Sequence, residues 1–94
     1  MRCLVVDRST SHPSMAVFEE EVLVCERVWD AEPTRSPEWI AELAKTLTAR
    51  GLSLSSFDRF VCGLGPGSFS GIRAGLSALQ GMALPGGKPV CGVS

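Results

Sequence analysis

The segment Val61–Gly75 constrains the fold more than any other part of the sequence, because glycines crowd into it before a helical pattern begins. Three glycines occur in the five positions 63–67, and Pro66 lies between two of them. Glycine adopts backbone angles and close approaches that other residues avoid, so this density indicates a sharp turn. Ser68 follows as a candidate N-cap for the next helix. The segment therefore predicts a strand, a tight turn and a helix in immediate succession.

The helix predicted after this turn, ending near Leu84, has two kinds of surface. Apolar residues recur at helical spacing on one stripe, which is typical of packing against a core. A second strip has almost no side chains, and each interior glycine in it costs about 1 kcal/mol relative to alanine. We expect close packing against another backbone to offset this cost, either within the domain or in a partner protein. The stripe is Ile72, Leu76, Leu79 and Ala83, and the strip is Gly71, Ala74, Gly75, Ala78 and Gly81.

Five segments in all predict β-strands, one of which leads into the glycine-rich segment, and one further segment predicts a helix. Ser36-Pro37-Glu38 is typical of a helix start, and Arg50-Gly51 is typical of a helix end. Cys3–Val6 is apolar throughout, as expected of a central strand with both faces covered. Loops are expected at Asp30–Arg35 and Leu52–Phe57. The predicted strands are Cys3–Val6, Ser14–Glu19, Val22–Trp29, Asp58–Cys62 and Lys88–Val93.

Three of these strands precede the first helix, and each helix is followed by one more strand. Strands connected through a helix run parallel, with right-handed crossovers. The first three strands are expected to form an antiparallel meander. The simplest result is a mixed five-stranded sheet of order 3-2-1-4-5 with two helices. This α/β arrangement is the ribonuclease-H-like half-domain, which also builds each lobe of the actin and sugar-kinase ATPases.

Composition narrows the class of protein. Ninety-four residues form one small domain, and a net charge of −1 without a Lys/Arg cluster argues against direct nucleic-acid binding. The hydrophobic content of 45% is high for a short chain and indicates surface that another element covers. No apolar run approaches the roughly 20 residues of a membrane span, and Asp7 interrupts the first run too early for a secretory signal. We therefore expect a cytoplasmic protein.

The cysteines stand singly in strand-like segments, without a CxxC pair. Such residues behave as small hydrophobes more often than as metal ligands or disulfide partners. We therefore expect buried, reduced thiols, no metal site and no disulfide. The four are Cys3, Cys25, Cys62 and Cys91.

At the level of motifs, the sequence resembles one protein family along its whole length. Gly65–Arg73 reads GPGSFSGIR and resembles the family pattern GPGSFTGLR, Pro89–Ser94 resembles PVVGVS, and Leu4–Thr10 resembles the family's first strand and Asp-Thr-Ser-Thr turn. These are features of the TsaB (YeaZ) family of tRNA threonylcarbamoyladenosine biosynthesis. Arg8 departs from the pattern, since the family has a small residue there. Family members have a second lobe, so the resemblance implies that residues 1–94 are a first lobe alone.

The resemblance implies a non-catalytic subunit that pairs with a TsaD-like transferase, or with itself, through its two helices. The partner would then hold the metal and the threonylcarbamoyl-adenylate chemistry. Arg73, one turn into the second helix, is a candidate hydrogen-bond donor at the interface. The complete predicted interface is Gly67, Ser68, Phe69, Gly71, Ile72, Arg73, Gly75, Leu76 and Leu79.

Asp7 offers an alternative function, because it ends the first strand where open α/β sheets bind ligands. In actin-like ATPases an acid at this place positions a hydrated metal near phosphate, so Asp7, Ser9 and Thr10 are candidate residues for weak binding of ATP and Mg²⁺. The structural interpretation is that Asp7 organises the amides of its own turn. A complete site of this kind needs both lobes, which favours the structural interpretation.

The turn formed by residues 63–67, which we call the glycine turn, lacks the sequence features of three catalytic or nucleotide-binding motifs. No Gly-Lys-Ser/Thr follows it, so it is not a P-loop. A dinucleotide fingerprint needs an acid about 20 residues later, and 85–94 has none. Gly-x-Ser-x-Gly is absent around Ser68, which excludes a nucleophile elbow. The sequence predicts no catalytic residue.

Overall fold

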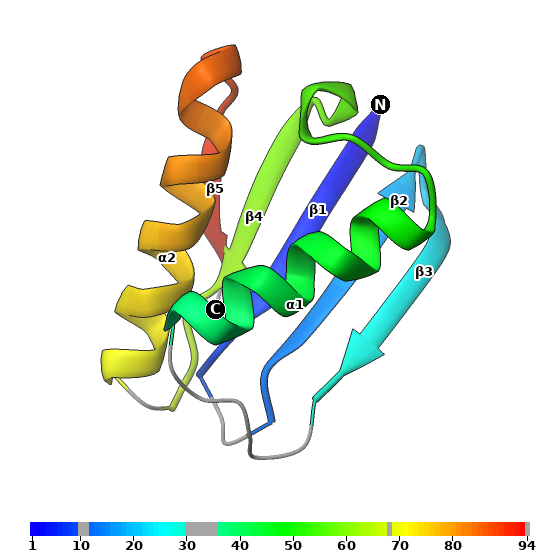
Figure 1. Cartoon of the computed structure of the whole chain (residues 1–94). Helices are drawn as coiled ribbons and strands as arrows, with labels where there is room; N and C mark the ends of the chain where they lie inside the picture. Colours follow the sequence, from blue (N-terminus) through cyan, green and yellow to red (C-terminus); the bar gives the residue numbers. More distant parts are fainter. Residues whose placement is uncertain (10–11, 30–35, 68, 94) are drawn as a thin grey trace.

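The computed structural model describes residues 1–9, 12–29, 36–67 and 69–93, and the side chains at 36, 37 and 69 are not described. Over these residues the chain forms one sheet and two α-helices (Figure 1). Short 3₁₀ turns follow α1 and α2, at Leu54–Ser56 and Leu84–Gly86. The main elements are β1 (Arg2–Asp7), β2 (Ser14–Glu19), β3 (Val22–Val28), α1 (Ser36–Ala49), β4 (Arg59–Gly63), α2 (Phe69–Ala83) and β5 (Val90–Val93).

The sheet has the predicted topology. Its five strands lie in the order β3-β2-β1-β4-β5. The strands β1, β2 and β3 form the antiparallel meander, while β4 runs parallel to β1 and β5 runs parallel to β4. Parallel neighbours require a crossover, which α1 and α2 provide. The ribonuclease-H-like α/β arrangement expected from the sequence is therefore confirmed.

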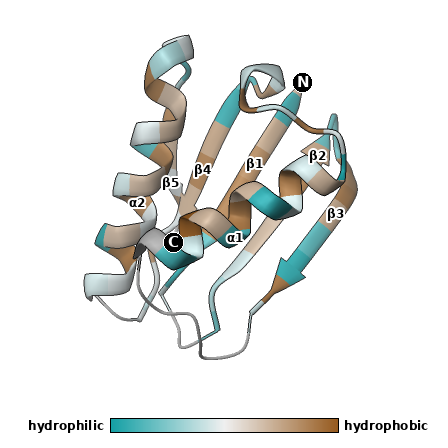
Figure 2. Ribbon diagram, viewed as in Figure 1, coloured by the Kyte–Doolittle hydropathy of each residue, from teal (hydrophilic) through white to brown (hydrophobic). Residues whose placement is uncertain are grey.

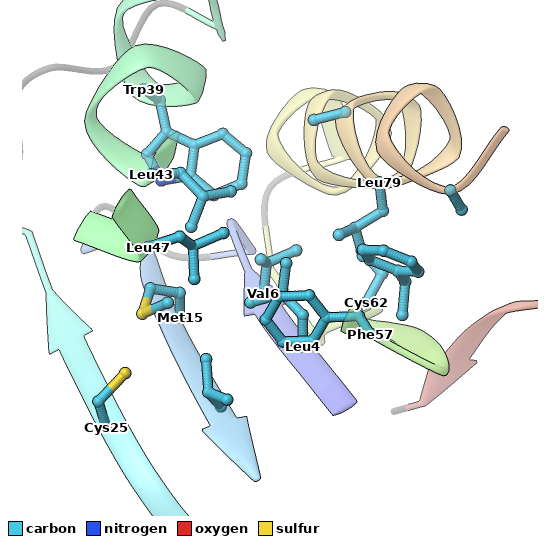
Figure 3. Packing of buried hydrophobic residues seen from close by; sticks show 14 of the residues in the cluster. Leu4, Val6, Met15, Cys25, Trp39, Leu43, Leu47, Phe57, Cys62 and Leu79 are labelled. Atoms are coloured by element: carbon cyan, nitrogen blue, oxygen red, sulfur yellow. The ribbon is translucent and has the colours of Figure 1, made fainter. Parts of the chain in front are cut away.

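Both helices lie on the same face of this sheet, and the hydrophobic core fills the space between the two layers (Figures 1 and 3). Alternate residues of the strands point into it: Leu4 and Val6 of β1 and Phe60 of β4 are 0% exposed. The helices contribute Trp39 and Leu79, which are equally inaccessible. We call this the covered face of the sheet. Its hydrophobic residues account for much of the brown along β1 and β4 in Figure 2.

Among the residues that the structure describes, none forms a helix on the other face of the sheet. The prediction that the Cys3–Val6 strand is covered on both faces is therefore wrong, since Cys3 and Val5 are only partly buried whereas Leu4 and Val6 are fully buried. Side chains of neighbouring strands shield this surface in part. We call it the open face, and its central residues are Cys3, Val5, Ala16, Phe18, Val61 and Cys91.

The boundaries of the elements differ little from the predicted ones. Gly51 ends α1 in the left-handed conformation expected of it (φ 70°). The last strand begins at Val90 rather than Lys88, because the left-handed Gly87 and then Pro89 keep the chain out of the sheet until that point. The predicted loop at 30–35 and the N-cap role of Ser68 lie outside the described residues.

The four cysteines do not share one environment. All are free thiols, with Cys25 and Cys62 buried and Cys3 partly buried. Cys91 is exposed, so its predicted burial is wrong; it lies in the edge strand and on the open face. Within the described residues, no helix has the length and apolar content needed to cross a membrane.

Candidate functional site

Asp7 ends β1 in a turn that its own side chain stabilises. Its Oδ1 accepts hydrogen bonds from the backbone N–H of Ser9 at 2.7 Å and from the Ser9 hydroxyl at 2.6 Å. Ser9 is buried, which makes these bonds part of the interior. This geometry is an Asx turn, in which a carboxylate satisfies a backbone amide two residues later. One carboxylate oxygen is therefore already committed within the chain.

The glycine turn packs directly on the Asp7 turn. A Cβ at Gly67 would lie 2.0 Å from the backbone oxygen of Ser9, so only glycine fits. A Cβ at Gly63 would lie 2.6 Å from Oδ2 of Asp7, which shows how closely the carboxylate lies against the end of β4. Burial, and secondly the Asp7 charge, raise the pKa of the neighbouring Cys62 thiol. The Asp7 turn and the glycine turn thus pack tightly against each other. Thr10, the third residue predicted to bind nucleotide, lies outside the described residues.

Arg8, which departs from the family pattern, packs away from the Asp7 turn. It is buried, and its guanidinium carbon lies 5.0 Å from the centroid of the Trp39 ring on α1. Its stem lies 3.7 Å from the position that a Cβ of Gly75 would occupy. Burial lowers the pKa of the Arg8 guanidinium. Arg8, which directly follows β1, is therefore buried between α1 and α2.

Two residues of the predicted partner interface face the chain's own core. A Cβ on Gly75 would contact the Cys62 sulfur at 3.4 Å, and Leu79 is 0% exposed. Their assignment to an interface is wrong, because both residues are buried against the chain's own core. Leu76 is partly buried against the same core. Ile72 is also partly buried, with its Cδ1 3.2 Å from the ideal Cβ position of Gly65.

The remaining predicted interface residues have different locations. Arg73 is exposed on the side of α2 that faces α1, and Gly71 is partly buried. Phe69 begins the helix, although only its backbone is described, and Ser68 lies outside the described residues. Gly67 is occupied by its contact with Ser9.

A groove opens between α1 and α2, which diverge from one another in Figure 1. It encloses about 420 Å³ and has small or polar walls, with Ile40 of α1 on one side. Ile40 also lines a second, more apolar hollow of about 240 Å³ toward the far end of α2, with Ala44, Leu47, Leu52, Leu54 and Met82. The two hollows therefore form one surface, which we call the α1–α2 groove. The α2 side of its first part consists of Ser70, Arg73, Ala74, Ser77 and Ala78.

Most residues of this groove lie outside the predicted interface. The predicted strip of small residues combines two sides of α2, whereas Gly75 faces β4 and Ala74 faces α1. The four-residue spacing of Ser70, Ala74 and Ala78 was the available signal for a separate line of small side chains. No group of three or more His, Cys, Asp or Glu side chains within the described segments could hold a metal ion.

By its sheet order and its layers, the protein is a ribonuclease-H-like α/β domain that presents a two-helix surface. A solved Bacteroides thetaiotaomicron protein with an actin-like ATPase fold has the same arrangement: it covers 96% of this chain and 32% of its own, with a TM-score of 0.59 and 11% identity. At that identity the likeness shows the fold alone.

The sequence comparisons are more specific. Residues 35–94 match the family described as "TsaD: tRNA N6-adenosine threonylcarbamoyltransferase". The Escherichia coli protein named "tRNA threonylcarbamoyladenosine biosynthesis protein TsaB" is 33% identical over 95 residues, which is 100% of this chain and 40% of that protein. The structure of YeaZ from Pseudomonas aeruginosa has a TM-score of 0.85 and 28% identity over 99% of this chain and 43% of its own.

The chain therefore belongs to the family described as TsaD: tRNA N6-adenosine threonylcarbamoyltransferase, and within these relatives to the TsaB (YeaZ) proteins. It spans about two fifths of the length of the relatives it matches. The match to residues 35–94 includes α1, β4, the glycine turn, α2 and β5, and hence every element that lines the groove.

Proposed function

We propose that this protein takes part in the biosynthesis of threonylcarbamoyladenosine in tRNA as a non-catalytic subunit, and that it binds a TsaD-like transferase through α1 and α2. The observation that carries the proposal is the α1–α2 groove. Apart from Arg73, the α2 wall of its first part is made of small side chains, so a partner helix could approach α2 more closely than helices with large contact residues allow. The part of the proposal that concerns threonylcarbamoyladenosine biosynthesis depends on the name of the Escherichia coli relative.

The distribution of burial supports α1–α2 as the contact surface. Ile40 is 36% exposed at the junction of the two hollows and Leu54 is 40% exposed at the rim, although both are large and apolar. Arg73 and the hydroxyl groups of Ser70 and Ser77 provide polar groups at the opposite end. An apolar centre with a polar margin is the usual composition of a protein interface.

The role of Asp7 supports a non-catalytic assignment. The alternative, an ATP-binding lobe, would use the Asp7 carboxylate to position hydrated Mg²⁺. Here Oδ1 of Asp7 bonds to Ser9, and Gly67 rests against the Ser9 backbone. We therefore propose that the Asp7 turn is structural and holds the end of β1 against the glycine turn. The transferase partner then holds the metal and the reacting groups.

Sedimentation velocity with a purified TsaD protein tests the pairing. We expect a complex between the 94-residue chain and TsaD, and we expect Ser77→Trp to weaken it at least tenfold, because the indole would fill the groove from an exposed position. Ala41→Trp is the matched control, since Ala41 is exposed on α1 and lines neither hollow.

Three outcomes would contradict the proposed function. They are independent sedimentation of the two proteins, equal weakening by both substitutions, and self-association of the chain through the groove in place of TsaD binding. Isothermal titration with ATP and Mg²⁺ tests the structural role of the turn. Binding in the micromolar range that Asp7→Asn abolishes would instead favour the nucleotide-binding alternative.

A further inference from the structure

The second hollow of the α1–α2 groove joins the hydrophobic core to the surface of the protein. Its most buried lining residues are Leu47, which is 3% exposed, and Leu52, which packs partly buried against the core. Met82 lines it from α2, while Ile40 and Leu54 lie at its rim, 36% and 40% exposed. The chain therefore leaves an apolar recess in contact with water, which is an unfavourable arrangement unless something fills it.

The lining side chains favour an apolar occupant. Among those within the described residues, Thr48 and Ser53 carry a hydroxyl group and the others are apolar. A charged ligand would lose its hydration here without gaining a countercharge from these side chains. An ordered water needs several polar partners in a polar site, which this lining does not provide. The second hollow therefore suits a hydrocarbon group.

The volume of the second hollow limits the size of that group. The hollow encloses about 240 Å³. Pockets for cofactors and drug-sized ligands enclose about 300 to 1,000 Å³. An apolar cavity of about 150 Å³ accommodates benzene. The occupant is therefore somewhat larger than benzene and smaller than most cofactors, which is the size of one large apolar side chain.

Ala44 keeps the second hollow open. Ile40, Ala44, Leu47 and Thr48 follow one another along α1 at helical spacing and all line the hollow, so they form one side of the helix. Ala44 has the smallest side chain of this line and is exposed. Leucine forms helices almost as well as alanine, so α1 itself does not require a small residue there. A larger side chain at position 44 would occupy the hollow that alanine leaves free.

The second hollow is continuous with the first part of the groove, because Ile40 lines both. A helix packed on the small side chains of α2 would therefore pass the mouth of the hollow. We propose that the second hollow is an anchor pocket, which receives one Leu, Met or Phe side chain from a helix of the TsaD-like partner. This inference rests on the proposed function and adds the kind of partner side chain on which affinity depends, since a few side chains in desolvated pockets supply most of the binding energy of an interface.

Filling the pocket from within the chain tests the proposal. Ala44→Leu places an isobutyl group where the partner's side chain would lie, and we expect it to weaken the complex with purified TsaD about tenfold or more in sedimentation velocity. Ala41→Leu is the matched control, because it makes the same change at an exposed position of α1 that lines neither hollow. It should leave the affinity unchanged. Both variants should retain the helix, which circular dichroism measures.

A second measurement identifies the anchor on the partner. Each large apolar residue on the surface helices of TsaD is replaced by alanine, and its affinity is measured for the unsubstituted chain and for the Ala44→Leu chain. One replacement should weaken binding to the unsubstituted chain about tenfold and have little further effect on binding to the Ala44→Leu chain. Non-additivity of this kind shows that two groups act at the same place.

The outcomes separate this inference from the proposed function. If Ala44→Leu and Ala41→Leu bind TsaD equally well while Ser77→Trp still weakens the complex, the anchor pocket is wrong and the proposed function stands. Additive effects for every TsaD replacement would also overturn the anchor pocket. If the unsubstituted chain forms no complex with TsaD, both proposals are wrong. Self-association of the chain that Ala44→Leu abolishes would make a second copy the occupant and would likewise contradict the proposal.

Discussion

The two faces of the sheet are built from the same strands and yet differ in how completely their side chains are buried. On β1, Leu4 and Val6 are 0% exposed beneath the helices, whereas Cys3 and Val5, their alternate neighbours, remain partly exposed. Both faces are apolar, but only the covered one is packed within the chain. Each Å² of apolar surface removed from water contributes about 25 cal/mol to the free energy of folding. The covered face, where more of this surface is buried, therefore supplies most of the stability. A strand whose sequence is apolar throughout therefore indicates that side chains on both faces of the sheet favour burial. It does not indicate which element buries each face.

The largest expected effect comes from forcing the covered face apart. Gly75→Leu would place a branched side chain where Cys62 and Arg8 already lie, within 3.4 to 3.7 Å of the first added carbon. We expect a loss of about 3 kcal/mol in the free energy of unfolding, which is the upper end of the usual cost of overpacking a core. Urea unfolding followed by the fluorescence of the buried Trp29 and Trp39 measures it.

Gly81→Leu is the control for that substitution. Nothing lies within 4 Å of a Cβ at Gly81, so the new side chain meets open space. Replacing a glycine inside a helix should then raise the free energy of unfolding by about 0.5 to 1 kcal/mol. Equal destabilisation by both substitutions would mean that α2 does not pack on β4 as described.

A smaller effect separates the two faces with one residue type. Val6→Ala removes two buried methyl groups from the covered face and should lower the free energy of unfolding by about 2 kcal/mol. Val5→Ala makes the same chemical change on the open face and should cost less than about 1 kcal/mol. The same urea titration compares them. Equal costs would show that the open face is packed in the isolated chain after all.

The smallest perturbation is the alkylation of the natural thiols, which also divide between the faces. Cys91 is exposed on the open face, whereas Cys62 is buried on the covered face. Burial raises the pKa of the Cys62 and Cys3 thiols, which lowers the fraction of reactive thiolate at a given pH. With iodoacetamide at pH 8 and peptide mass mapping, we expect Cys91 to react first and Cys3 more slowly.

The two buried thiols complete that measurement. Cys25 and Cys62 should react only when urea unfolds the chain, and Cys91→Ser should remove the fastest phase. Rapid modification of Cys62 in the native protein would contradict the close packing of α2 on β4.

Much of the fold could be predicted from the sequence because its signals are local. The strand at Ser14–Glu19 has the predicted bounds, and Gly51 ends α1 as its position indicated. The sheet order followed from the order of elements and the handedness of crossovers. These inferences depend on backbone geometry and on short-range periodicity, which a single sequence contains.

The site was less predictable, because it depends on which element lies against each side chain. The small residues of α2 divide between β4 and the α1–α2 groove. The four-residue spacing of Ser70, Ala74 and Ala78 marks a separate line, but it does not say which element that line faces. The burial of Arg8 beside Trp39 was equally hidden, since the two residues are distant in sequence. The interface and its partner stay predictions, and the experiments above address them.

The contact between Arg8 and Gly75 couples two positions that lie far apart along the chain. The arginine stem fills the volume that a larger residue at position 75 would need. Evolutionary change at one position is therefore constrained by the other: a small side chain at position 8 would free space for a large apolar residue at position 75. Libraries that randomise both positions together should recover such exchanges, whereas libraries that vary position 75 alone should return only small residues.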